Sequence, residues 1–151
     1  MAGDPIPSDQ RKPMNPFNLP LREVSSLDII YETIGEDGIT RMVQAFYRQV
    51  PSDDVLAPMY PEDDLKGSEE RLRDFLLYRF GGPQRYVAER GHPRLRMRHA
   101  PFPIDQRARD RWILLMDNAI CAATPPPEIG AMLKEFFRNV ATFLINHDTD
   151  V

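Results

Sequence analysis

Apolar residues recur every three or four positions over most of this chain, and that spacing predicts α-helices. The first predicted helix starts after possible N-caps at Ser25 and Ser26 and stops at Gly35. A second helix is predicted from Glu36 to about Val50. No run of four or more residues alternates convincingly between apolar and polar positions, so we expect no sheet.

Prolines and glycines divide the remainder of the chain into shorter helical segments. A short turn of helix is predicted over 55–60, and a longer helix follows residues 62–64 and stops at the glycines 81–82. Residues 83–103 carry Gly91 and prolines at several positions and are expected to form loops with only short helical turns. Two longer helices are predicted over 104–122 and 128–147. The predicted fold class is therefore all-α.

The N-terminal part of the chain lacks this periodicity. Residues 1–22 contain five of the 15 prolines, which is typical of a flexible extension rather than a packed core. We therefore expect a proline-rich extension over 1–24, one domain over 25–147 and a short tail over 148–151. A single domain of that size can bury a core and a cofactor.

Composition excludes several classes of protein. The 42% apolar and 28% charged residues are typical of a soluble globular protein, and no run is long and apolar enough to span a membrane. The acidic, proline-containing start does not look like a signal peptide, and a single cysteine excludes an internal disulfide, so we expect a cytoplasmic protein. Cys121 lies in an apolar run and is expected to be buried. The net charge of −4, with the basic residues outside 85–111 scattered along the chain, argues against nucleic-acid binding.

The stretch from His92 to Phe102 is the most informative for function. His99 follows Leu95 by four residues and precedes Phe102 by three, so in a helical turn the three side chains share one face. Arginines at positions 94, 96 and 98 surround that face with positive charge. An imidazole on an apolar face among arginines suits a flat, apolar, anionic ligand that also needs a nitrogen donor. Haem fits, with its iron for His99 and its propionates for guanidinium groups.

Three polar aromatic side chains, Tyr47, Tyr60 and Trp112, occur in otherwise apolar helical segments. Each carries an O–H or N–H group that needs a partner if it is buried. They either fill the core with their polar ends toward solvent or converge on one ligand. The acidic pairs at 53–54 and 63–64 are interpreted as helix-start and solvent-exposed residues. Motifs of zinc hydrolases, serine hydrolases and phosphate-binding loops do not occur in the sequence.

The chain from about 26 to 147 resembles the truncated haemoglobins, specifically their group II or O-type branch. Two segments are the most specific for this resemblance: the arginine- and histidine-rich stretch Arg90-Gly-His-Pro-Arg-Leu-Arg-Met-Arg-His-Ala-Pro-Phe102 and the run Tyr60-Pro-Glu-Asp-Asp-Leu65. Further matching segments are Phe46-Tyr47, Glu69-Glu-Arg-Leu72, Phe80-Gly-Gly-Pro83 and Arg109-Asp-Arg-Trp112. The resemblance implies a trimmed globin, with two helix pairs packed two-over-two around haem b.

The resemblance also implies roles for individual residues. His99 corresponds to the histidine that binds the iron, and Tyr47, Tyr60 and Trp112 correspond to the polar residues on the opposite, distal side of the haem. Ser68 falls at the distal gate position. The further residues expected to contact haem are Leu72, Phe75, Tyr86, Met97 and Arg98.

The function implied is binding of dioxygen and other small ligands, such as carbon monoxide, nitric oxide and peroxide. Two or three hydrogen-bond donors around the ligand predict high affinity and slow release. A haem enzyme with peroxidase-like or nitric-oxide-detoxifying dioxygenase activity is the alternative, so whether the protein is an enzyme is left open. Oxygen transport, a reductase partner and a homodimer are likewise left open.

Overall fold

The computed structural model describes residues 27–83 and 103–146, and they form helices and connecting turns with no strand among them. The four α-helices and three short 3-10 helices are α1 (Asp28–Gln49), η2 (Val50–Ser52), η3 (Ala57–Met59), η4 (Glu62–Asp64), α2 (Leu65–Arg79), α5 (Gln106–Ala123) and α6 (Pro127–Phe143). The predicted all-α fold class is confirmed for this part of the chain. The N-caps predicted at Ser25 and Ser26 lie outside the described residues, as do 84–102, most of the segment expected to be a loop.

Helix α1 contains the predicted break at Gly35. The two predicted helices follow each other without a loop, but Gly35 adopts φ +67° and ψ −177°, which is not helical. Residues with a Cβ atom rarely adopt these backbone angles, so glycine is the residue that permits the kink. The kink redirects the chain so that Ile39, Val43 and Phe46, each at most 1% exposed, face the core.

Replacement of Gly35 by alanine is expected to destabilise the protein by roughly 1–3 kcal/mol, the usual cost of a backbone held in a sparsely populated conformation. An added Cβ would meet no atom within 4 Å, so the cost comes from the backbone angles alone. Gly130→Ala is a matched control, because Gly130 lies within α6 and its added Cβ would meet only ordinary contacts at 3.7 and 3.9 Å. We expect that control to stabilise the protein by roughly 0.5–1 kcal/mol. Urea unfolding measures both, and equal effects would contradict this explanation.

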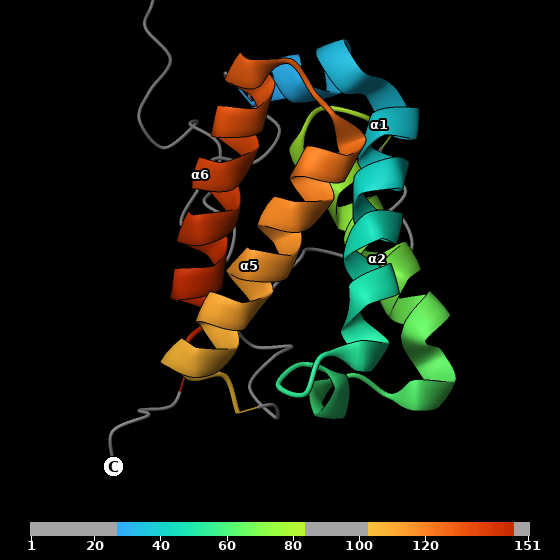
Figure 1. The fold of residues 1–151 in the computed structure, drawn as a ribbon. Coiled ribbons are helices and arrows are strands. Elements are labelled where there is room, and N and C mark those ends of the chain that lie inside the picture. The colour runs from blue at the N-terminus through green and yellow to red at the C-terminus, as the bar shows by residue number, and fades with distance from the viewer. Residues whose placement is uncertain (1–26, 84–102, 147–151) are drawn as a thin grey trace, which may run out of the picture.

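The helices form two pairs, α1 with α2 and α5 with α6, and α1 also packs on α5 (Figure 1). The stripes predicted from apolar spacing face inward: Leu76, Met116 and Leu133 are among the side chains that are at most 1% exposed. This arrangement is the expected two-over-two packing. None of the described helices is long and apolar enough to cross a membrane.

Two details differ from the sequence-based expectation. Helix α6 ends at Phe143 instead of His147, because the chain leaves the helix to pair Asn146 with Ile104. The backbone N–H of Asn146 donates to the Ile104 carbonyl at 2.8 Å, and the Ile104 N–H donates to the Asn146 side chain at 2.8 Å. Cys121, expected to be buried, is exposed, because α5 turns the flanking residues Ile120 and Ala123 inward.

Candidate functional site

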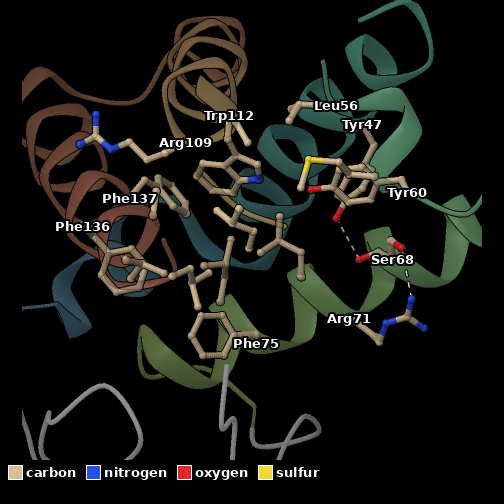
Figure 2. A pocket seen from close by; sticks show the side chains of 18 of the residues that line it. Tyr47, Leu56, Tyr60, Ser68, Arg71, Phe75, Arg109, Trp112, Phe136 and Phe137 are labelled. Carbon is tan, nitrogen blue, oxygen red and sulfur yellow. Dashed lines mark hydrogen bonds between the residues drawn. The ribbon is translucent and has the colours of Figure 1, made fainter. Parts of the chain in front are cut away.

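A cavity of about 320 Å³ lies between the two helix pairs. This volume falls within the usual range of small-molecule sites. Most of its lining is apolar, and Figure 2 shows these side chains together with the polar ones. The described lining residues are Tyr47, Leu56, Met59, Tyr60, Pro61, Ser68, Arg71, Leu72, Phe75, Leu76, Ile104, Ala108, Arg109, Trp112, Phe136, Phe137, Val140, Ala141 and Leu144. They include all six predicted site residues that fall within the described part of the chain: Tyr47, Tyr60, Ser68, Leu72, Phe75 and Trp112.

The polar ends of the three candidate aromatic residues gather on one side of this cavity. The Tyr47 hydroxyl donates to the Ser68 carbonyl at 3.2 Å, which connects α1 to α2. The Tyr60 hydroxyl has hydrogen-bonding partners in both Tyr47 and Trp112, and the indole N–H can only donate, so Tyr60 accepts from it. Figure 2 shows the indole nitrogen pointing toward the side of the cavity that carries the tyrosines. The structure thus brings together residues that are 13 and 52 positions apart in the sequence.

Both tyrosines keep their protons at neutral pH. Burial, followed by the nearby Tyr60, raises the pKa of Tyr47 well above its ordinary value. Burial also raises the pKa of Tyr60, although hydrogen bonding with Trp112 and Tyr47 partly offsets this effect. A protonated phenol can donate a hydrogen bond, so this side of the cavity carries two O–H groups and one N–H group. In the structure the Tyr47 O–H is donated to the Ser68 carbonyl and the indole N–H to Tyr60, so a small ligand receives either one only in exchange for that partner.

Aromatic packing holds these groups in place. The rings of Tyr47 and Tyr60 meet edge to face with centroids 5.6 Å apart. Phe46 packs against Tyr47 at 5.0 Å and against Trp112 at 5.1 Å, and Phe137 also packs against the tryptophan at 5.5 Å. The pairs Phe46–Tyr47 and Tyr47–Tyr60 are edge to face and the two pairs of Trp112 are tilted, and close ring contacts of this kind are favourable and limit ring rotation. The donors are therefore oriented before any ligand arrives.

The loop that carries Tyr60 is held by Asp53. Its carboxylate accepts the backbone N–H groups of Val55 and Leu56, both at 2.9 Å, and its other oxygen accepts from Arg111 Nη1 at 2.7 Å. The helix-start role predicted for residues 53–54 is confirmed at Asp53, but its predicted solvent exposure is wrong. Its side chain is 8% exposed, because the turn closes over the carboxylate and Arg111 covers it.

Acid should weaken the contribution of Asp53 to stability. Burial alone would raise its pKa, but hydrogen bonds from Arg111, Leu56 and Val55 outweigh burial and hold the pKa below its ordinary value. The ionised carboxylate therefore stabilises the fold at pH values above about 4, the ordinary value for aspartate, and this stabilisation is lost as the pH falls through the lower, folded-state pKa. We expect Asp53→Asn to unfold more easily than the wild type at pH 7, with the difference shrinking below about pH 4. Urea unfolding across this range measures it, and a difference independent of pH would contradict the assignment.

Two arginines line the cavity that sequence reasoning did not single out. Arg71 donates to Asp64 at 2.9 Å and to the Ser68 hydroxyl at 3.2 Å, and Arg109 donates to Thr142 at 3.1 Å and to Asp110 at 3.1 Å. The helical spacing offered a signal for Arg71, which lies three residues after Ser68 and one before Leu72. Both arginines lie in segments that resemble the truncated haemoglobins, Arg71 in 69–72 and Arg109 in 109–112.

The cavity suits haem in shape and chemistry. Its apolar walls match a flat aromatic ring system, and its polar groups match a small ligand and acidic side groups. The described lining contains no imidazole. His99 lies outside the described residues, as do Tyr86, Met97 and Arg98, so their roles stay predictions.

Comparison with known proteins is consistent with this arrangement. The profile of the bacterial-like globin family matches residues 29–144. Group 2 truncated hemoglobin YjbI of Bacillus subtilis is 40% identical over 95 residues, which cover 63% of this chain and 71% of that protein.

Solved structures show the same fold. The hemoglobin of Chloroflexus aurantiacus superposes with a TM-score of 0.75 at 44% identity, covering 78% of this chain and 98% of that one. The Bacillus subtilis haemoglobin described as truncated and oxygen-avid gives a TM-score of 0.74 at 36% identity, covering 78% of this chain and 98% of that one.

Proposed function

Since the chain belongs to the bacterial-like globin family, in its group II truncated haemoglobin branch, we propose that it holds dioxygen with high affinity and releases it slowly. The family binds haem b, which is the cofactor of this chain. The observation that carries the finer proposal is the convergence of three hydrogen-bond donors, Tyr47, Tyr60 and Trp112, on one side of the cavity.

Haem would supply an iron that takes a protein nitrogen as ligand and binds a small molecule. We assign the protein nitrogen to His99, on the basis of the stretch 92–102. Leu72 and Phe75 provide apolar walls for the macrocycle, and both line the cavity on α2. Tyr86, Met97 and Arg98 are proposed as further contacts of the cofactor.

The polar side of the cavity favours a ligand that accepts hydrogen bonds. Haem would donate electron density to a dioxygen molecule held here, and the donors Tyr47, Tyr60 and Trp112 would stabilise the negative charge that this molecule gains. Water is largely excluded by the apolar walls, so each hydrogen bond contributes more than it would at the surface, roughly 1–3 kcal/mol. Carbon monoxide accepts hydrogen bonds poorly, so the same donors should favour dioxygen over carbon monoxide.

Relatives support the proposal. The Bacillus subtilis protein is described as oxygen-avid, and this chain shares its fold. The aromatic packing that orients Trp112 and the tyrosines supports avid binding here, because rings that are already held in place lose little conformational freedom when the ligand arrives.

Absorption spectra of the purified protein test the proposal. We expect a Soret band, a ferrous spectrum that changes on exposure to dioxygen, and an oxygenated form that decays slowly when dioxygen is removed. A protein without a Soret band would overturn the cofactor assignment. Rapid loss of dioxygen would overturn slow release while leaving haem binding intact.

A further inference from the structure

The loop between α1 and α2 contributes four residues to the cavity wall that the described α-helices alone would not supply. The cavity is lined by Leu56, Met59, Tyr60 and Pro61, which follow within eight residues of Asp53. The 3-10 helices in this loop have three residues each, so the loop has little regular backbone structure to fix its position. Its position therefore depends on side-chain contacts with its neighbours.

Asp53 makes such contacts both within the loop and with α5. Inside the loop, one carboxylate oxygen accepts the N–H groups of Val55 and Leu56 and fixes the turn that leads to Tyr60. Outside it, the second oxygen accepts from Arg111 on α5. The same guanidinium nitrogen also lies 3.0 Å from Asp54 Oδ1. One carboxylate thus joins the turn of the loop to a helix that is 58 residues further along the chain.

Arg111 is the residue directly before Trp112. The ion pair fixes the loop against α5 at the point where the indole N–H reaches the Tyr60 hydroxyl. Arg111 adjoins Trp112 on α5, and Asp53 lies in the loop that carries Tyr60. The ion pair between Arg111 and Asp53 therefore holds Trp112 and Tyr60 next to each other. A shift of the loop along α5 would change both together.

We propose that Arg111 and Asp53 are positioning residues, which set the distance between Tyr60 and Trp112 and thereby the rate at which a small ligand leaves the cavity. This inference rests on the proposed function, because it uses ligand release as one readout. Neither residue lines the cavity, so neither touches the ligand. The pair acts through geometry, by keeping the loop that carries one donor next to the helix that carries another.

The hydrogen bonds between the end of α1 and α5 do not hold the loop in place. Gln49, at the end of α1, donates to the Leu115 carbonyl at 2.9 Å and accepts from Asn118 at 3.0 Å. These bonds fix α1 against α5, but they lie before the loop begins. Loss of the ion pair should therefore move the loop while the helix pairs stay packed.

The experiment compares Asp53→Asn and Arg111→Gln with the wild-type haem protein. Trp112 is the only tryptophan, so its indole N–H gives a single signal in nuclear magnetic resonance spectra of the isotope-labelled protein saturated with carbon monoxide. We expect faster hydrogen exchange of that proton in both variants. We also expect dioxygen release, followed by stopped flow, to accelerate roughly 2- to 30-fold, the range in which residues that act without touching a ligand change its binding.

A matched control is available on the same helix. Asp117 on α5 pairs with Arg138 on α6 at 2.9 Å, and Asp117→Asn removes a similar ion pair away from the loop. We expect it to change neither the indole exchange nor the release rate. Arg111→Lys keeps the charge and should restore much of the wild-type behaviour. In combination with Trp112→Phe, Asp53→Asn should add little further acceleration, because the interaction that it positions is already absent.

The outcomes separate this inference from the proposed function. If Trp112→Phe accelerates release while Asp53→Asn and Arg111→Gln leave release and indole exchange unchanged, the positioning role is wrong and the proposed function stands. If Trp112→Phe itself leaves release unchanged, the proposed distal role fails. In that case faster indole exchange in the two ion-pair variants would still support their positioning of the loop.

Discussion

Replacement of His99 by alanine should abolish stable haem binding. The side chain is the proposed axial ligand, and no imidazole occurs in the described lining of the cavity that could replace it. Loss of a residue that merely supports a metal ligand costs roughly 10- to 100-fold in metal affinity, and loss of the ligand itself should cost more. We expect the purified variant to lack the Soret band, while its circular dichroism still shows helix.

The other histidines provide matched controls for this result. His92 lies seven residues before His99 in the same arginine-rich stretch, and His147 lies in the C-terminal part of the chain. His92→Ala and His147→Ala should both retain the Soret band. Free imidazole added to His99→Ala should restore part of the absorbance, because it supplies the missing nitrogen donor. A full Soret band in His99→Ala, or its loss in His92→Ala, would contradict the assignment.

The helices could be predicted from the sequence because the pattern that encodes them is local. Burial of Ile39, Val43 and Phe46 follows from their spacing, and the kink at Gly35 follows from the conformational freedom of one residue. The C-terminal end of α6 was predicted wrongly because no local pattern encodes it. Its position depends on the pairing of Asn146 with Ile104, a contact between residues 42 positions apart that no local pattern encodes.

In the site, too, the residues could be predicted from local patterns, but the contacts between distant residues could not. Tyr47, Tyr60 and Trp112 stood out because polar aromatic residues occurred at apolar positions, and the resemblance to a family assigned them a common role. Their convergence depends on the packing of α1, α5 and the loop between α1 and α2, which spacing does not specify. Asp53 shows the limit of the sequence pattern, because an acidic pair at a helix start usually faces solvent. Its burial requires Arg111, a partner 58 residues away.

Replacement of Trp112 by phenylalanine should accelerate the release of dioxygen by roughly 5- to 150-fold, which corresponds to the loss of one hydrogen bond worth about 1–3 kcal/mol in a site that excludes water. The substitution keeps an aromatic ring in contact with Phe46 and Phe137, so the packing that these rings provide is largely retained. It removes the indole N–H, which points to the polar side of the cavity (Figure 2). Stopped-flow displacement of dioxygen by carbon monoxide measures the rate, and an unchanged rate would show that the indole does not hold the ligand.

A second variant shows whether the indole acts alone or together with the phenol. Tyr60→Phe removes the hydroxyl that accepts from Trp112 and should also accelerate release. The two groups are hydrogen-bonded to each other, so removal of either one changes the orientation of the other. We therefore expect the double variant to release dioxygen more slowly than the product of the two single effects predicts. Independent, multiplicative effects would mean that each donor reaches the ligand without the other, and the network of Tyr60 and Trp112 would then have no part in retaining dioxygen.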